Sequence, residues 1–419
     1  MTEMSVFVQV WIVALMAVQS VIVALFVARM RAFRREDVSG ERLPRAGVVL
    51  ALRGSDPYLT DLLRALFRQD YPDFEVLIVL DDDGGAGRAV IESVVTEMGV
   101  TNVTIDALRD PLETCSLKCS AVRQAVSALE SRCEVIALID GDAAPHRLWL
   151  RDLVRPLRDP TIGVTTGNRW YMPRHANWGS LVRYFWNAGS VVQMWLNGVP
   201  WGGSMAMRVD VIRRIGLLSV WSRSLVDDSM VSREVHRHGY RVRFVPGVIA
   251  VNTERISLSQ FLLWVRRQLV AARTPLRSWV VVLMHGEALA LVQLLAAGLA
   301  IGGLMAGDGH MAVMNGLALA AFWIFNFATT AVLEHSMRRV TRLNGPSQRW
   351  LSPTVLYKLF PALLLTLVTY PYVLTRAVFC RRISWRGVEY EIIGRDRVRM
   401  IEYRPFGSPE APGSAASLV

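Results

Sequence analysis

The chain has 419 residues, 52% of them hydrophobic, and a formal net charge of +11. This length allows one catalytic domain of about 200–250 residues plus accessory segments. The mean hydropathy is +0.30, and the apolar residues are concentrated in long blocks. These two features exclude an ordinary soluble enzyme. The arginines gather beside these blocks, where anionic lipid headgroups are their natural partners, so the charge does not indicate nucleic-acid binding.

Residues 5–28 carry no charge and are long enough to cross a bilayer as a helix. A cleaved signal peptide is the alternative, but no basic region precedes this segment and its apolar core is too long. Arginines follow it instead, at positions 29, 31, 34 and 35. We therefore interpret residues 1–30 as a transmembrane anchor, and the positive-inside rule places the next domain in the cytosol.

The next part of the chain, residues 40–256, alternates between short apolar runs and segments with helical periodicity. Such alternation is typical of a mostly parallel sheet with flanking helices, built from right-handed crossovers. The expected strands cover residues 47–52, 74–80, 103–105, 135–139 and 240–245, and the expected helices cover residues 59–67, 86–98 and 118–131. We expect the stretch from residue 165 to 203, rich in Trp, Asn and Gly, to form irregular loops over the sheet edge.

Acidic and basic side chains follow these expected strands, at the edge where open α/β sheets bind ligands. Asp81 and Asp82 end the second strand, where a carboxylate can accept the imide N–H of uracil or ribose hydroxyls. Lys118 opens a helix and can pair with a phosphate or a carboxylate. Asp140 and Asp142 offer two hard oxygen ligands that suit a Mg²⁺ or Mn²⁺ ion shared with a diphosphate. A solvated turn is the alternative reading of each acidic cluster.

A further acidic pair, Asp227-Asp228, follows the glycines Gly202 and Gly203 after about twenty residues. The glycines would allow the backbone to approach a ligand closely. A carboxylate delivered opposite the metal could deprotonate an acceptor hydroxyl as a general base. We assign this role to Asp228, with Asp227 as a second catalytic candidate.

The last part of the chain returns to the membrane. Residues 257–279 form an expected amphipathic helix that should lie in the headgroup plane. Residues 280–380 contain two expected transmembrane helices and a shorter apolar segment, 359–375, whose prolines and basic flanks suggest a re-entrant or interfacial hairpin. Residues 381–419 are expected to be a cytosolic tail, disordered from about residue 405. The protein is expected to be a multi-pass protein of the plasma or inner membrane.

The ordered set of motifs resembles the membrane-bound family 2 glycosyltransferases, and among them the ceramide glucosyltransferase-like branch. The resemblance covers about residues 47–274 and is most specific in Leu-Arg-Gly-Ser-Asp-Pro at 52–57 and in residues 69–75, with an echo at 383–390. It implies a GT-A-type nucleotide-sugar-binding domain. It also implies that Asp81 or Asp82 contacts the nucleoside, that Asp140 and Asp142 bind metal and diphosphate, and that Asp228 is the base.

One departure from that pattern concerns the family's Gln- or Arg-x-x-Arg-Trp motif. The matching stretch here retains Arg267 and Gln268 as candidates for binding the nucleotide sugar, together with Gly203, but Val270 and Ala271 replace the Arg-Trp pair. The sequence offers Arg266 or Arg273 as a substitute cation and no evident substitute for the tryptophan. The loss argues against a processive polysaccharide synthase.

These observations favour an inverting glycosyltransferase that moves a sugar from a nucleotide sugar, with UDP as the first choice of nucleotide, to a membrane lipid. Two alternatives are a polysaccharide or oligosaccharide synthase and a non-catalytic membrane protein that binds nucleotide sugars. The sequence leaves the sugar and the acceptor lipid open.

Overall fold

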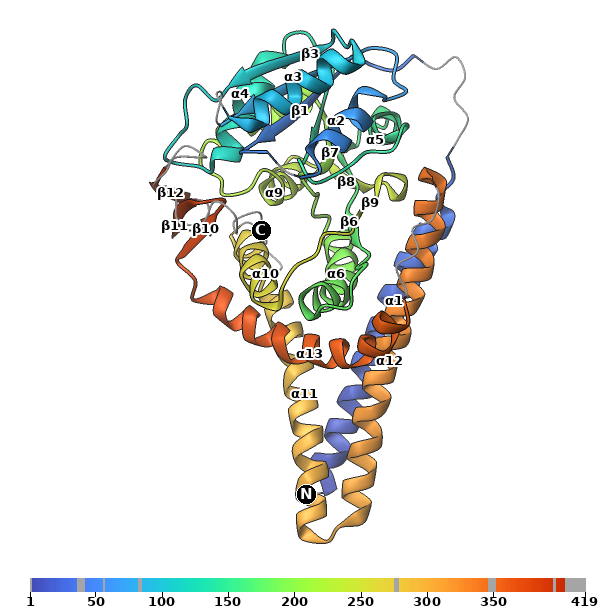
Figure 1. Ribbon diagram of the computed structural model, residues 1–419. Coiled ribbons are helices and arrows are strands. Elements are labelled where there is room, and N and C mark those ends of the chain that lie inside the picture. Colours follow the sequence, from blue (N-terminus) through green and yellow to red (C-terminus); the bar gives the residue numbers. More distant parts are fainter. Residues whose placement is uncertain are drawn as a thin grey trace.

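The computed structural model describes residues 2–35, 42–55, 57–81, 85–274, 279–345, 352–394 and 397–403. An α/β domain stands on three long helices, which run side by side away from it (Figure 1). A transverse helix and a small C-terminal sheet lie where the two parts meet (Figure 1).

The α/β domain is built on a seven-stranded sheet of order β3-β2-β1-β4-β7-β5-β8. Only β7 runs antiparallel to its neighbours in this sheet. The strands are β1 (Ala46–Leu52), β2 (Phe74–Leu80), β3 (Val103–Ala107), β4 (Val135–Ile139), β5 (Ile162–Thr166), β7 (Ser204–Arg208) and β8 (Arg241–Phe244). The expected mostly parallel α/β fold is confirmed.

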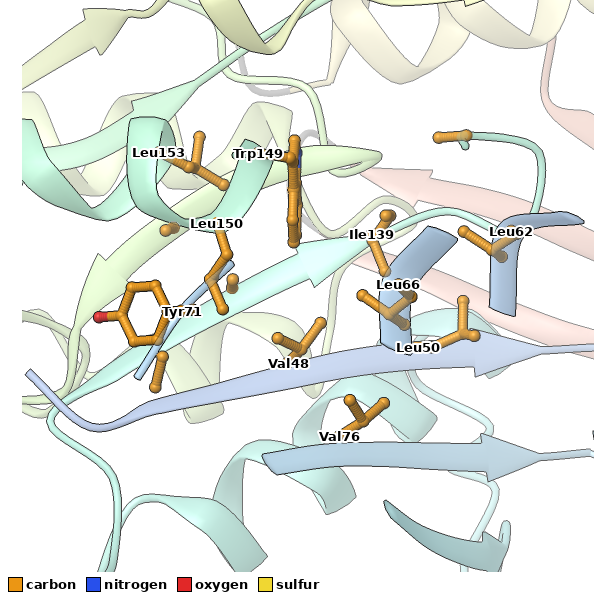
Figure 2. Close-up of a cluster of buried hydrophobic side chains, with 14 of the residues drawn as sticks. Val48, Leu50, Leu62, Leu66, Tyr71, Val76, Ile139, Trp149, Leu150 and Leu153 are labelled. Carbon is orange, nitrogen blue, oxygen red and sulfur yellow. The ribbon is translucent and has the colours of Figure 1, made fainter. Parts of the chain in front are cut away.

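Helices cover both faces of this sheet, which explains why its strands are almost continuously apolar. On one face, Val48, Leu50 and Ile139 point toward Leu62 and Leu66 of α2 (Leu59–Phe67), and α5 (Trp149–Val154) packs beside them (Figure 2). The alternate strand residues pack with α4 (Leu117–Leu129) on the other face. The remaining helices of the domain are α3 (Ala86–Met98), α7 (Val209–Arg214), α8 (Leu217–Trp221) and α9 (Ser229–Arg237).

The expectation of irregular loops over residues 165–203 is wrong for most of that stretch. It contains β6 (Arg169–Tyr171), which pairs with β9 (Ala250–Asn252), and the 19-residue helix α6 (Trp178–Leu196). Apolar side chains at helical spacing bury one face of α6, namely Leu181, Phe185, Ala188 and Val192. The many aromatic and glycine residues concealed this period because they suggest a loop when read by composition.

Among the residues that the structure describes, four helices are long and apolar enough to cross a membrane: α1 (Thr2–Ala32), α11 (Trp279–Ala306), α12 (Gly309–Thr341) and α13 (Pro353–Val378). The first three form the stalk in Figure 1, and α13 runs across it. The hairpin expected at 359–375 is not formed. Instead, α13 is one continuous helix that contains Pro361 and Pro371. The amphipathic helix is also shorter than expected: α10 (Leu258–Arg273) ends before Trp279, which already belongs to α11.

Within residues 381–419, which were expected to be a cytosolic tail, the chain forms a three-stranded antiparallel sheet. Its strands are β10 (Arg382–Trp385), β11 (Val388–Gly394) and β12 (Arg397–Glu402). Ile383, Val388 and Tyr390 are buried against α10 and the start of α4. The alternation of buried and exposed residues is the signature of a strand with one covered face. The predicted disorder from about residue 405 lies outside the described residues.

Candidate active site

One cavity of about 190 Å³ opens at the carboxyl ends of the parallel strands. Eight of the candidate residues line it, and they come from β2, β4, α4, α10 and the loop before α9: Asp81, Lys118, Asp140, Asp142, Asp227, Asp228, Arg267 and Gln268. Neighbouring parallel strands end at a common edge, so residues far apart in the sequence meet there. Asp82 lies outside the described residues.

Lys118 is the central cation of this cavity. The Ser116 hydroxyl accepts a hydrogen bond from the Cys119 N–H, which caps α4 and puts Lys118 in its first turn. The ammonium lies 2.5 Å from Asp140 Oδ1 and 2.9 Å from Asp227 Oδ1. Burial alone would lower the pKa of Lys118, but these two carboxylates raise it above its usual value.

The pKa values of the two carboxylates shift in opposite directions. Burial raises the pKa of Asp227 to about 6, against the attraction of Lys118 and with a further rise from Asp228. Burial also acts to raise the pKa of Asp140, but Lys118 outweighs it and the pKa lies below its usual value. The second carboxylate oxygen of Asp227 is buried without a hydrogen-bond partner. Asp227 therefore serves as an ion-pair partner deep in the cavity wall.

The glycine pair lies directly behind these acids. A Cβ atom on Gly203 would stand 2.7 Å from Asp140 Oδ2 and closer still to the Trp201 indole, and one on Gly202 would collide with the Asp227 carboxylate. Gly203 thus packs against the back of Asp140, and the cavity lining among the described residues does not include it. The glycines allow the chain to approach the carboxylates that form the site.

Asp228 is held by the backbone around it. Its Oδ2 accepts from the Gly202 N–H at 3.1 Å, and its Oδ1 accepts from the N–H and hydroxyl of Ser229 at 2.5 and 3.0 Å. The carboxylate also caps the N-terminus of α9, which favours a negative group. Its side chain is half-buried and its orientation is fixed.

Asp142 and Arg169 face each other across the cavity, with Asp142 Oδ2 3.7 Å from the guanidinium. Asp142 keeps 32% of its side-chain surface exposed, more than Asp140 at 21%. Arg169 lies over the rings of Tyr171, Trp201 and Trp264. Asp142 is therefore more accessible than Asp140.

Asp81 is engaged on the opposite side of the cavity. It forms an ion pair with Arg53 and accepts a hydrogen bond from the Tyr403 hydroxyl at 2.8 Å. Only 4% of its side chain is exposed, so any ligand at this end of the cavity would meet it together with these two partners. Tyr403 comes from the end of the C-terminal segment, which shows that this segment helps to shape the site.

Helix α10 presents Arg267 and Gln268 to the cavity. Arg273, one of the two cations offered as a substitute, is used elsewhere: it donates to the carbonyls of Ala377, Val378 and Cys380 at the end of α13. The other, Arg266, is not among the described residues that line the cavity.

Sequence reasoning assigned no site role to several residues that line this cavity, among them Arg53, Arg169, Trp385 and Arg386. Two signals were available. Arg53 stands in the 52–57 motif, and Trp385 and Arg386 stand in the 383–390 echo. Arg169 had none, because it lies in a short strand inside the stretch read as loops.

A second, mostly apolar cavity of about 330 Å³ continues from the first toward the long helices. Its walls come from α6, α10, α11, α12 and α13, with Gln19 and Ile22 of α1. Several residues line both cavities where they meet: Arg169, Trp201, Val226, Asp228, Trp264, Gln268 and Ala271. A charged chamber and an apolar chamber thus share one wall, and Asp228 stands in it.

Comparisons with known proteins agree on the class of protein. The profile described as "Glycosyl transferase family 21" matches residues 9–398. The "Probable glycosyltransferase YdaM" of Bacillus subtilis (strain 168) is 23% identical over 227 residues, which are 51% of this chain and 52% of that protein. The chain therefore spans about half the length of this curated relative.

Two solved structures show overall similarity. One is the mannosyltransferase PcManGT from Pyrobaculum calidifontis in complex with GDP-Man and Mn²⁺, at 17% identity and a TM-score of 0.42, covering 87% of this chain and 99% of that one. The other is GalNAc-T7 with UDP, GalNAc and Mn²⁺, at 13% identity and a TM-score of 0.37, covering 56% of this chain and 51% of that one.

Proposed function

Because the chain belongs to glycosyl transferase family 21, we propose that it transfers a sugar, with inversion, from a nucleotide sugar to a membrane lipid. The ceramide glucosyltransferase-like resemblance read from the sequence agrees with this family. One observation carries the proposal. Asp228 lies at the junction of a charged cavity, which suits a nucleoside diphosphate, and an apolar cavity, which suits a lipid chain.

The donor is assigned to the charged cavity. Lys118, Arg169 and Arg267 bring positive charge to its walls, and guanidinium groups bind phosphate oxygens in a bidentate manner. Asp81 lies at the end of the cavity bounded by Arg53 and Tyr403, where it would orient the nucleoside. UDP is our first choice, because a carboxylate can accept the uracil imide N–H.

A divalent ion, Mg²⁺ or Mn²⁺, fits the donor chemistry of Asp140 and Asp142. No group of three or more His, Cys, Asp or Glu side chains suited to a metal occurs among the described residues. Two carboxylates suffice for an ion that also takes oxygen ligands from a diphosphate and from water. When bound, such an ion neutralises charge that develops on the leaving diphosphate.

Asp228 is the proposed general base. It takes the proton from the acceptor hydroxyl while the acceptor oxygen forms a bond to the anomeric carbon of the sugar. The bond from that carbon to the diphosphate oxygen breaks, and nucleoside diphosphate leaves with the electron pair. The hydrogen bonds from Gly202 and Ser229 hold the carboxylate in place for this single displacement. Inversion follows because attack and departure occur on opposite faces.

The acceptor is assigned to the apolar cavity. Its walls include residues of four helices that are long and apolar enough to cross a membrane, so a lipid can enter from the bilayer with its hydroxyl at the Asp228 end. The four arginines between residues 29 and 35 support a cytosolic position of the α/β domain, by the positive-inside rule.

The test is metal-dependent transfer by the full-length protein in a native lipid extract. UDP-glucose, UDP-galactose, UDP-N-acetylglucosamine and GDP-mannose are supplied in turn, and the lipids are analysed by mass spectrometry. We expect one donor to yield a new glycolipid of fixed size. A product that grows with time would point instead to a synthase, and nucleotide binding without any product would point to a binding protein.

A further inference from the structure

The Arg-Trp pair missing from α10 has a structural counterpart elsewhere in the chain. Val270 and Ala271 stand where the pair was expected, yet a tryptophan and an arginine enter the same cavity from the C-terminal sheet. They are the consecutive residues Trp385 and Arg386, at the tip of the hairpin that joins β10 to β11.

The backbone of the hairpin tip forms a two-residue turn. Trp385 pairs with Val388, which leaves Arg386 and Gly387 as the two turn residues, with φ of 48° and 77°. Two positive φ angles are typical of the type I′ turn that suits a two-residue hairpin loop. Arg386 is the only non-glycine residue with positive φ in the described part of the chain. An arginine at this position costs conformational energy, and such residues cluster at functional sites.

Hydrogen bonds hold the hairpin against the α/β domain at its tip and on its second strand. Arg53 donates through Nε to the Arg386 carbonyl at 2.8 Å, and Arg386 donates through Nη1 to the Arg53 carbonyl at 2.9 Å. Tyr390, on the second strand, accepts a hydrogen bond from the Leu117 N–H at the start of α4. The hairpin is therefore held by Arg53, which forms an ion pair with Asp81, and by the start of α4, which carries Lys118.

Trp385 meets the surviving arginine of the α10 motif. The Arg267 guanidinium lies 5.0 Å from the centre of the Trp385 ring, within the range of a cation–π contact. Its Nη1 is buried and has no hydrogen-bond partner. Burial, with Arg169 and Arg386 close by, lowers the pKa of Arg267 to about 10. Arginines this close to one another repel, and an anion bound between them would offset that repulsion.

The short side chains on α10 leave room for the hairpin. Val270 is fully buried, in the same apolar cluster as Ile383 and Val388 of the hairpin. Ala271 lines the same cavity as Trp385. An arginine and a tryptophan at these two positions would compete with the hairpin for this space.

We propose that Trp385 and Arg386 replace the absent Arg-Trp pair, Arg386 binding the donor diphosphate together with Arg267 and Trp385 acting as a positioning residue for Arg267. This inference rests on the proposed function, since it needs a diphosphate donor in the charged cavity. It assigns the C-terminal sheet a direct part in donor binding.

The test is calorimetric binding of UDP and, separately, of inorganic pyrophosphate, each with Mg²⁺, to the full-length protein in detergent. Arg386→Gln and Trp385→Leu should each lower the affinity for both ligands about tenfold, as expected for the loss of one charge-assisted contact. Arg386→Lys and Trp385→Phe should restore part of the affinity. The matched control is Arg382→Gln, which removes an exposed arginine from the same hairpin and should bind as wild type does.

Equal binding of both probes by wild type and Arg386→Gln, with an unchanged unfolding midpoint, would overturn the inference and leave the proposed function standing. Loss of UDP binding with pyrophosphate binding retained would also overturn it, because the hairpin would then contact the nucleoside. If wild type binds neither UDP, GDP nor pyrophosphate, the proposed function fails with it. If Arg386→Gln does not fold, Trp385→Leu and Arg267→Gln provide the comparison.

Discussion

The ammonium of Lys118 lies 2.9 Å from the Oδ1 of Asp227, a carboxylate with only 2% of its side chain exposed. The same ammonium contacts Asp140 on its other side, so one cation pairs with two carboxylates of the site. A buried charge without a partner is costly, because the protein interior solvates it poorly. Lys118 therefore stabilises the cavity in addition to any contact with the donor.

Replacing Lys118 with methionine should destabilise the protein by about 3–5 kcal/mol near neutral pH, the usual cost of breaking a buried ion pair. Burial already raises the pKa of Asp227 to about 6 from 3.8. A raised carboxylate pKa means that the folded state binds the proton more tightly, so this group's contribution to stability falls as the pH rises through that range. Without Lys118 the pKa rises further, and the fall continues to higher pH.

The measurement is the thermal unfolding midpoint, read from tryptophan fluorescence at about pH 5 and about pH 8. The gap between wild type and Lys118→Met should be small at the lower pH, where Asp227 can take up a proton, and large at the higher. The matched control is Lys118→Arg, which keeps the charge. An equal gap at both pH values would contradict the ion-pair account.

Asp228→Asn should abolish transfer and leave donor binding near that of wild type. The amide cannot accept the acceptor's proton, and loss of a general base costs about 10²- to 10⁴-fold in rate. Asp142→Asn serves as the contrast, because it should weaken metal-dependent binding of UDP itself. Turnover and calorimetric UDP binding, measured on both variants, distinguish the two roles. Near-normal turnover by Asp228→Asn would remove it as the base.

Local sequence was sufficient for five of the seven strands of the sheet and for the acids at its edge, whereas β5 and β7 were not predicted. The apolar runs that end at Leu80 and Ile139 are buried on both faces, and a polar residue directly after such a strand has to lie at the ligand-binding edge. Asp81 and Asp140 could be placed for this reason alone. Their partners were harder to predict, because Lys118 was recognisable as a cation but its choice of Asp140 and Asp227 depends on how α4 packs.

Two parts of the site depend on long-range packing that no local pattern encodes. Helix α6 was concealed by its aromatic and glycine content, although its buried face has helical spacing. The C-terminal hairpin looked like a tail because each of its strands is short, and its stability comes from contacts more than 300 residues away, such as that of Arg386 with Arg53. The cavity wall formed by Trp385 and Arg386 was therefore beyond local reasoning.

Gly203→Ala should weaken metal-dependent UDP binding about tenfold or more, because the new methyl group would stand 2.7 Å from Asp140 Oδ2 and closer to the Trp201 indole. Asp140 would have to move away from Lys118. Calorimetry with UDP measures the effect. The matched control is Gly189→Ala in α6, where a Cβ meets nothing within 4 Å. Unchanged binding by Gly203→Ala would show that the site tolerates a shift of Asp140.

Filling the apolar cavity should block the acceptor and spare the donor. Gly189 lines this cavity from α6, and a Cβ built on it has open space around it, so Gly189→Phe adds a ring to the cavity without an initial clash. We expect glycolipid formation to fall about tenfold or more, with UDP binding unchanged, because the lipid chain and the ring compete for the same space. Glycolipid yield and calorimetric UDP binding are measured on the same preparation.

The matched control for this variant is Gly298→Phe in α11, an exposed glycine that also has open space around it and lies outside the lining of the apolar cavity. It adds the same ring to a long apolar helix, so it reports any general effect on membrane insertion or folding. Equal loss of transfer in both variants would attribute the effect to the helices themselves. Full transfer by Gly189→Phe would show that the acceptor reaches Asp228 by another path.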